Sequence, residues 1–429
     1  MSVEFPTQSG VRRHFLLLQG PCGNFFRRLQ TSLEAQGHAC TRVVINGGDL
    51  VNTGLGRKVL YRRSLEDWPA WLMAFSQRQG ITDVVAYGDC RSYHRNAIAT
   101  LKPLGIAIHV LEEGYLRPYW ITCERDGVNG HSKLVDLDVG RFDAGKLGPP
   151  EPEIAFAGTQ HRYMWAGFLY YLWTALLTPL FPRYVSHRDL DVGGEAALWL
   201  ARFVTWPGRR IKTARALEEI SLLRKPVHLA LLQLNGDSQT REHSSFSSVR
   251  HFVEHCMAEF AASGVRDAVL VFKNHPLDNG VVNLARLIRD ETARHGLGGR
   301  VFFVETAKLV ALLNRATSVI VINSTACHQA LQRGIPTLVM GRAIYNHPEI
   351  VPRMRLANFF RARPVMRRRH YKLLVSLLAQ TSQMNGGYYG REAQALALPA
   401  LTRQLIEGYP EIESFLKPAQ RDRLPRTAS

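Results

Sequence analysis

Short apolar runs that end in polar or glycine-rich turns, each followed by a helix-like segment, limit the fold of this chain more than any other feature. Between Val269 and Gly341 they read VLVFKNHP, FFVE and SVIVINSTACHQALQRGIPTLVMG. Parallel α/β domains have this pattern, and their ligands bind at the carboxyl ends of the strands. The pattern therefore predicts an α/β fold with a ligand site in the C-terminal half.

The N-terminal half repeats the pattern. Apolar runs at 14–20, 40–47, 81–89 and 106–114 alternate with helix-like segments, which predicts a Rossmann-like domain. A second set, at 227–235, 268–275, 300–305, 318–324 and 337–341, predicts another. Two Rossmann-like domains that face a cleft form the GT-B architecture. We expect an N-terminal domain at 1–150, a helical inter-domain region at 151–222, a C-terminal domain at 223–365 and a helical tail at 366–429.

The net charge of +18 indicates an anionic partner. Basic residues gather between Arg353 and Lys372, with no acid among them. An anionic lipid surface suits this stretch better than nucleic acid, because no nucleic-acid-binding motif accompanies it. An anionic substrate or a merely basic surface would also account for the charge.

The six cysteines are scattered, and none forms a CxxC pair. This spacing predicts neither a disulfide scaffold nor a zinc site, and we expect no metal or cofactor. The N-terminus lacks a charged segment followed by an apolar core, so we expect no secretory signal and a cytoplasmic location.

The 18-residue segment MWAGFLYYLWTALLTPLF at 164–181 carries no charge. A single membrane span would place the two α/β halves on opposite faces of the membrane, and Pro179 also disfavours it. Two other interpretations remain open. The segment is either a buried inter-domain helix or a helix in the membrane interface, where its aromatic residues and basic flanks suit a lipid surface.

Polar residues follow two strands of the C-terminal half. Lys273 and His275 end one strand, and Asn323, Ser324 and Thr325 form a small-residue turn that opens a helix. The free N–H groups at a helix start favour a phosphate. His275 before Pro276 could instead be a structural histidine. We predict a nucleotide or sugar-nucleotide site here.

Four strand ends of the N-terminal half also carry polar or glycine residues. The first turn, LQGPCGNFFRRL, resembles a glycine-rich phosphate loop, but it matches neither of the NAD and ATP motifs. Each turn alone could be purely structural, whereas four on one edge predict the wall of a cleft. The candidates are Gly20, Gly23, Asp49, Asp89, Arg91, Glu112, Glu113, Tyr115 and Arg117.

The run LQLNGDSQTREHSS follows the first strand of the second half. It supplies Gln233, Asp237, Gln239 and His243. A carboxylate in a cleft can act as a general base or a nucleophile. The alternative is an ordinary loop in which Asp237 caps the helix near 245–260.

Eight motifs, in order, resemble the capsule polysaccharide biosynthesis family, and most closely its KpsS/LipB type. They are FLLLQGPCGNFFRRLQTSLEAQGH, RVVINGGD, YGDCRSYHRNA, LEEGYLRPYWIT, FPRYVSHRDL, LQLNGDSQTREHS, KNHP and NSTACHQAL. The resemblance implies a GT-B-like β-Kdo glycosyltransferase that uses CMP-Kdo. It implies that the enzyme starts the oligo-Kdo linker of a capsule on lysophosphatidylglycerol, at the inner face of the bacterial inner membrane. The N-terminal domain would then face the acceptor and the C-terminal domain the donor.

The resemblance also implies residue roles. His275, Pro276 and Ser324 would hold the CMP part of the donor, together with Gln233, Gln239, Lys273, Asn323 and Thr325. Related enzymes retain the anomeric configuration and use the aspartate of a Q-x-x-x-D motif, which Gln233 and Asp237 match. Glu112 or Glu113 would be the acid/base, and Arg117 would pair with an anion. Ala326-Cys327-His328 departs from the small residues that many GT-B proteins carry there.

Two alternatives remain. The chain could elongate or branch a glycan with Kdo or sialic acid instead of modifying a lipid. It could also be a non-catalytic factor that recruits other capsule assembly and export proteins.

Overall fold

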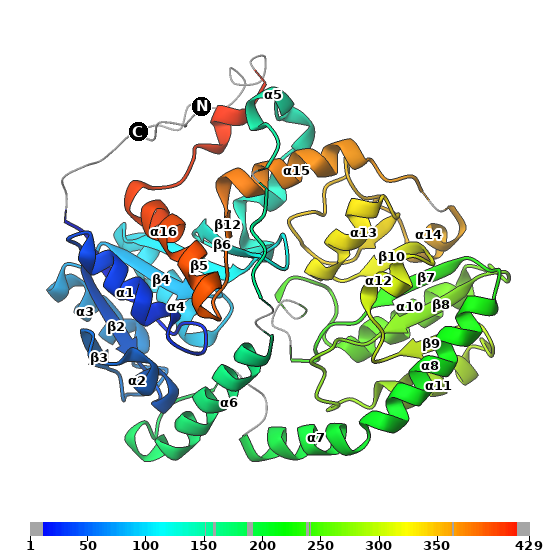
Figure 1. Cartoon of the computed structure of the whole chain (residues 1–429), viewed down its shortest axis with the longest axis horizontal. Helices are drawn as coiled ribbons and strands as arrows, with labels where there is room; N and C mark the ends of the chain where they lie inside the picture. The colour runs from blue at the N-terminus through cyan, green and yellow to red at the C-terminus, as the bar shows by residue number, and fades with distance from the viewer. Residues whose placement is uncertain are drawn as a thin grey trace. The chain divides into compact units, whose positions relative to one another are not determined.

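The computed structural model describes residues 12–150, 152–157, 160–186, 192–236, 240, 242–362 and 364–417. The chain divides into two compact units. Unit 1 comprises Met1–Lys133, Arg141–His187 and Leu373–Ser429, and unit 2 comprises Leu134–Gly140 and Arg188–Lys372. Both units are built on a largely parallel sheet with helices packed on it (Figure 1). The prediction of an α/β protein with two parallel-sheet halves is confirmed.

Within the described residues, the sheet of unit 1 has seven strands in the order β12-β6-β5-β4-β1-β2-β3. Strands β1 to β5 pair in parallel, β6 runs antiparallel to β5, and β12 runs antiparallel to β6, so β12 points the same way as β5. The four predicted runs overlap β1, β2, β4 and β5, whereas β3, β6 and β12 were not predicted. The bounds are β1 His14–Leu17, β2 Ala39–Val44, β3 Lys58–Leu60, β4 Asp83–Tyr87, β5 Ala107–Glu113, β6 Trp120–Arg125 and β12 Gln383–Asn385.

Strand alternation buries both faces of this sheet. Phe15 and Leu17 face one apolar core, which α1 and α16 complete, and Leu16 and Leu18 face the other, which α3 and α4 complete. Helices α1 and α16 lie side by side (Figure 1). The helices are α1 Phe25–Ala35, α2 Gly47–Thr53, α3 Trp68–Gln79, α4 Ser92–Leu101, α5 Ala144–Leu147, α6 Gln160–Leu176 and α16 Arg391–Glu407. Helix α15, Arg368–Thr381, spans the boundary between the two units.

The described part of unit 2 contains a five-stranded sheet in the order β11-β10-β7-β8-β9, parallel throughout. Each of the five predicted apolar runs overlaps one strand, and β10 begins two residues before its run. The strands are β7 Val227–Leu231, β8 Val269–Lys273, β9 Val301–Val304, β10 Ala316–Val321 and β11 Thr337–Val339. The helices are α7 Val192–Val204, α8 Trp206–Leu222, α10 Val249–Ala262, α11 Leu284–Arg294, α12 Leu309–Leu313, α13 His328–Arg333 and α14 Leu356–Ala362.

The helical region between the two halves is shared between the units. Helix α6 packs against α2 of unit 1, whereas α7 and α8 belong to unit 2. There Arg202 pairs with Asp278 and Glu305 at 3.4 and 3.2 Å, and Arg209 pairs with Glu305 at 3.0 Å. Within the described ranges, no helix combines the length and apolar character needed to cross a bilayer.

Candidate functional site

The carboxyl edge of the unit 1 sheet gathers most of the N-terminal candidates. Because β1, β2, β4 and β5 are parallel, the segments that follow them meet at one edge of the sheet. Gly20 and Gly23 follow β1, Asp89 and Arg91 follow β4, and Glu112 and Glu113 end β5. This edge is therefore the candidate site of unit 1.

Glu112 is a carboxyl group at this edge whose raised pKa suits proton transfer. Its Oε1 accepts the Glu113 N–H at 2.9 Å, and its Oε2 lies 3.5 Å from Asn129 Nδ2. Burial raises the pKa of Glu112 to about 7. The hydrogen bond from the Glu113 N–H opposes this rise, and the charge of Glu113 adds to it. A carboxyl group that titrates near neutral pH can both accept and return a proton. Glu113 itself accepts a hydrogen bond from the Tyr87 hydroxyl at 3.1 Å.

Asp89 is buried and held by three donors. Its Oδ2 accepts from Val128 N–H at 3.0 Å and lies 3.1 Å from His131 Nδ1, and the Cys90 thiol donates to Oδ1 at 3.1 Å. Burial alone would raise its pKa, but these hydrogen bonds outweigh it and hold the pKa of Asp89 below its usual value. Asp89 therefore stays ionised and orders the loop at 128–131.

Asp49 lies beneath α6, in a buried polar network. Tyr170 of α6 donates to Asp49 Oδ1 at 2.9 Å and accepts from Asn46 Nδ2 at 2.8 Å and Gln19 Nε2 at 2.7 Å. Arg91 joins the network by donating to Gln19 Oε1 at 2.9 Å. Burial raises the pKa of Asp49 to about 6, against the opposing effects of Arg42 and the Tyr170 bond. In this structure Asp49 and Arg91 fasten α6 to the sheet edge.

The two glycines of the first turn have steric reasons to be glycine. A Cβ on Gly20 would lie 2.7 Å from the ring of Phe26, and Gly23 has φ of +106°. Arg117 is exposed, and its Nε donates to the Gly114 carbonyl at 3.2 Å. The two glycines therefore permit the tight turn after β1, whereas the Arg117 contact lies in the turn after β5.

In unit 2, the ends of β7 and β10 are joined by an amide pair. Gln233 Nε2 donates to Asn323 Oδ1 at 2.9 Å, and the Asn323 N–H donates back to Gln233 Oε1 at 3.2 Å.

The turn after β10 is ordered at Ser324. Its hydroxyl accepts from the Ala326 N–H at 3.3 Å, and the Tyr345 hydroxyl donates to the Ser324 carbonyl at 2.8 Å. The predicted helix after this turn is a 3₁₀ turn, Thr325–Cys327, followed by the six residues of α13.

Lys273 and His275 follow β8, next to β7 in the same sheet. Lys273 is buried, its Nζ donates to the Asn274 carbonyl at 3.0 Å, and burial lowers its pKa. His275 Nδ1 accepts the Leu277 N–H at 3.1 Å, before which Pro276 is exposed. The parallel order β10-β7-β8 brings these residues and the Gln233–Asn323 pair to one edge.

Asp237 and Gln239 lie outside the described residues, so their predicted roles stay predictions. The helix that follows begins at Val249, and Ser248 caps it by accepting the His251 N–H at 3.2 Å.

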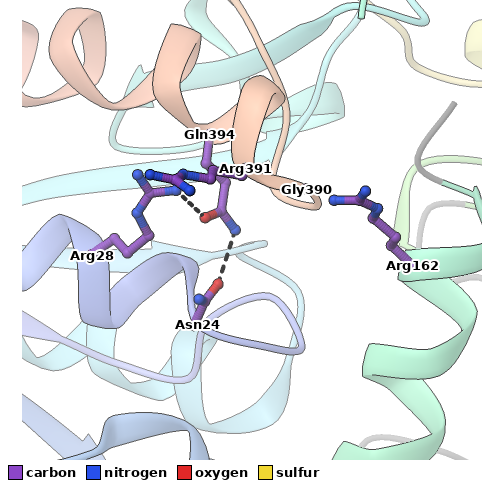
Figure 2. Close-up of a pocket in the computed structure, with 6 residues that line it drawn as sticks. All are labelled: Asn24, Arg28, Arg162, Gly390, Arg391 and Gln394. Carbon is purple, nitrogen blue, oxygen red and sulfur yellow. Dashed lines mark hydrogen bonds between the residues drawn. The ribbon is translucent and has the colours of Figure 1, made fainter. Parts of the chain in front are cut away.

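One pocket of unit 1 was not foreseen from the sequence. It has a volume of about 490 Å³ and is lined by Asn24, Arg28, Arg162, Gly390, Arg391 and Gln394 (Figure 2). The Arg28 guanidinium donates to Gln394 Oε1 at 2.7 Å, and Gln394 Nε2 donates to Asn24 Oδ1 at 3.1 Å. Its residues come from α1, α6 and α16, and local patterns give no sign that these helices meet.

The chain belongs to the family of capsule polysaccharide biosynthesis proteins, whose pattern matches residues 82–389. It is 33% identical over 384 residues to the capsule polysaccharide export protein KpsS of Escherichia coli, covering 88% of this chain and 97% of KpsS. It is 30% identical over 390 residues to the capsule polysaccharide modification protein LipB of Neisseria meningitidis serogroup A, covering 88% of this chain and 92% of LipB. The resemblance seen in the sequence motifs is confirmed.

Two solved structures from Thermosulfurimonas dismutans show more distant similarity. The β-Kdo 2,7 transferase of KpsC is 12% identical, covers 92% of this chain and 99% of its own, and gives a TM-score of 0.40. The β-Kdo 2,4 transferase of KpsC is 12% identical, covers 92% and 100%, and gives 0.38. Similarity at this level assigns neither fold nor activity to the present chain.

Proposed function

We propose that this protein is a retaining β-Kdo glycosyltransferase that transfers Kdo from CMP-Kdo to a lysophosphatidylglycerol acceptor and so starts the oligo-Kdo linker of a capsular polysaccharide. The observation that carries the proposal is the similarity to KpsS and LipB over 88% of the chain. The choice of CMP-Kdo as donor and lysophosphatidylglycerol as acceptor rests on what the resemblance to the KpsS/LipB type implies.

The proposed reaction proceeds in two displacements. The Asp237 carboxylate attacks the anomeric carbon of Kdo and CMP leaves with the bonding electron pair. An acceptor hydroxyl then attacks the same carbon and releases Asp237, so the configuration is retained. The proton of that hydroxyl goes to a carboxylate, for which Glu112 is favoured by its pKa near 7.

The polar strand ends of unit 2 support the donor part of the proposal. The buried Lys273 and the Gln233–Asn323 pair offer cationic and amide groups at one sheet edge. The net charge of +18 suits an anionic donor, an anionic lipid and attachment to the inner face of the bacterial inner membrane.

The direct test is to incubate the purified full chain with CMP-Kdo, generated in place, and a fluorescent lysophosphatidylglycerol analogue, and to identify products by mass spectrometry. One added Kdo supports an initiating transferase, whereas a ladder indicates an elongating enzyme. A fluorescent oligosaccharide in place of the lipid tests the glycan-acceptor alternative.

Replacement of the proposed nucleophile should abolish transfer. We expect Asp237→Ala to reduce turnover by at least about 10³-fold, because no covalent intermediate can then form. Unchanged circular dichroism and thermal unfolding would show that the variant is folded. Turnover close to wild type would remove Asp237 from the mechanism.

A non-catalytic role in capsule assembly or export is the second candidate, because the relative KpsS is described as an export protein. Absence of both transfer and CMP binding in the purified protein would favour it. Transfer by the purified protein would exclude a purely non-catalytic role.

A further inference from the structure

The pocket in Figure 2 lies where two helices of unit 1 begin. Asn24 immediately precedes α1, which follows β1, and Gly390 immediately precedes α16, which follows β12. Because β12 points the same way as β5, both helices start at the carboxyl edge of the sheet. The pocket therefore belongs to the same edge as Glu112.

The lining of this pocket is cationic. Arg28, Arg162 and Arg391 contribute three guanidinium groups, and no carboxylate is among the lining residues that the structure describes. Figure 2 shows the Arg162 side chain extending from α6 toward Gly390. Three arginines without an acid in the lining suit a phosphate, whose oxygens accept paired hydrogen bonds from guanidinium groups.

A buried glutamine orders the polar floor of the pocket. Gln394 is 4% exposed, accepts from Arg28, and donates to Asn24 Oδ1 and to the Tyr388 carbonyl at 2.7 Å. Oδ1 of Asn24 accepts from Gln394, and its Nδ2 has no partner among the described residues. Nδ2 can therefore donate to a ligand. Arg28 and Asn24 are thus held in place before an anion binds, whereas Arg162 and Arg391 are exposed.

The start of α1 adds to the positive potential of the pocket. Neither Asn24 nor Gly390 caps its helix with a side-chain hydrogen bond. The N–H groups of the first turn of α1 (11 residues) and of α16 (17 residues) therefore rely on other acceptors. The first turn of α1 carries no acid, whereas the first turn of α16 carries Glu392. The start of α1 beside three arginines therefore favours an anion more than the arginines do alone.

An exposed apolar stripe begins next to the pocket. On α6, Trp165, Phe168 and Leu169 follow Arg162 by one to two turns and are 62%, 58% and 46% exposed. An anion site at the head of an exposed apolar stripe matches the two parts of a phospholipid, since its headgroup is charged and its chain is apolar. A free phosphate or a nucleotide would leave this stripe unused.

We propose that this pocket binds the phosphodiester of the acceptor lipid, with the acyl chain along Trp165, Phe168 and Leu169. The inference rests on the proposed function for the identity of the lipid, but it is a statement about binding and can be tested without turnover. It places the acceptor phosphate between the starts of α1 and α16, at the sheet edge that carries Glu112.

Binding is measured by titration calorimetry on the full chain, with a short-chain lysophosphatidylglycerol kept below its micelle concentration. We expect Arg391→Gln and Arg162→Gln each to weaken binding by about 10-fold or more, because each removes a charge-assisted hydrogen bond. Arg403→Gln, an exposed arginine near the other end of α16, is the matched control and should bind as wild type. A monoacylglycerol without phosphate should bind at least about 10-fold more weakly than the phospholipid.

Further ligands identify which part of the lipid each group holds. Leu169→Ser should weaken the lysophospholipid but leave binding of glycerol 3-phosphate unchanged. CMP binding should be unaffected by Arg391→Gln. Loss of CMP binding in that variant would reassign the pocket to the nucleotide. Lysophospholipid that binds no more tightly than inorganic phosphate, and is unaffected by Leu169→Ser, would reduce the pocket to a site for free phosphate.

Kinetics separate this inference from the proposed function. If the protein transfers Kdo, Arg391→Gln should raise KM for the lipid about 10-fold and leave KM for CMP-Kdo unchanged. If the protein binds the lipid through Arg391 but never transfers Kdo, the proposed function fails and the pocket assignment stands. Wild-type protein that does not bind the lysophospholipid, or variants that bind it normally, would overturn the assignment.

Discussion

Glu112 ends β5 in surroundings that favour its protonated form. Burial is the main cause, and it raises the pKa of Glu112 from its ordinary value of 4.5 to about 7. A carboxyl group whose pKa is higher in the folded state than in the unfolded state stabilises the fold fully below pH 4.5. That contribution is lost as the pH rises through about 7.

The variant Glu112→Gln tests this linkage at the residue scale. A neutral amide has no ionised form to desolvate, so the variant should gain stability relative to wild type as the pH rises from 4.5 to 8. The gain in the free energy of unfolding should reach about 3 kcal/mol at most, from the size of the shift. Urea unfolding of both proteins at several pH values measures it. A difference between the two proteins that stays constant with pH would contradict the raised pKa.

Residue identity alone could not separate the roles of the candidate carboxylates. Asp49, Asp89 and Glu112 all follow strands at one edge, and the sequence therefore predicted all three as cleft residues. The structure distinguishes them by their partners: Tyr170 covers Asp49, three donors hold Asp89, and Glu112 is half-buried with few donors. Asn129 lies 17 residues from Glu112, and Tyr170 lies 121 residues from Asp49. Local sequence patterns do not show contacts over such separations.

At the scale of elements, α6 shows that a segment rich in apolar residues can pack on one side and stay exposed on the other. The sequence left a buried helix and an interfacial helix open. In the structure Tyr170 and Thr174 meet α2, while Trp165 and Leu169 are exposed on the same helix. The interfacial interpretation stays a prediction, and the polar bonds of Tyr170 explain why one side of α6 is fixed.

Removal of the Tyr170 hydroxyl should loosen this attachment. Tyr170→Phe leaves Asp49, Asn46 and Gln19 each short of one buried hydrogen bond, so we expect a loss of about 1–3 kcal/mol in the free energy of unfolding. Tyr119→Phe is the matched control, because its hydroxyl has no partner among the described residues. Equal unfolding midpoints in urea for Tyr170→Phe and wild type would mean that the network contributes nothing to stability.

The strands themselves were predictable where their residues are apolar in long runs. Central strands such as β4, β7 and β8 are buried on both faces, so a run of apolar residues marks them. Strand β12 has only three residues, Gln383–Asn385, and none of its neighbours in sequence marks it as a strand. Its pairing with β6 depends on contacts more than 250 residues away, such as Gln383 Nε2 donating to Thr122 Oγ1 at 2.9 Å.

At the scale of the whole molecule, the same long-range contacts make unit 1 from the two ends of the chain. We expected a helical tail after residue 366, and α15 and α16 are indeed helices there. However, α16 also completes the core of unit 1, in which Leu398, Leu401 and Leu405 are buried together with Phe25 and Leu29 of α1. Helices α16 and α1 therefore share one apolar core, and the packing of α1 depends on α16.

This shared core predicts which elements lose stability when a residue of α16 is replaced. Leu401 is fully buried, so Leu401→Ala should leave a cavity and cost about 2–5 kcal/mol. Hydrogen exchange should then speed up in β1 and α1, which are more than 360 residues away in sequence, because they share its core. Exchange in β7, β8 and α10 should not change, since these elements belong to the core of unit 2. Arg403→Gln, on the exposed side of α16, is the control. Faster exchange confined to α16 would mean that α1 and β1 hold their structure without it, and the last segment would then be an appendage of unit 1.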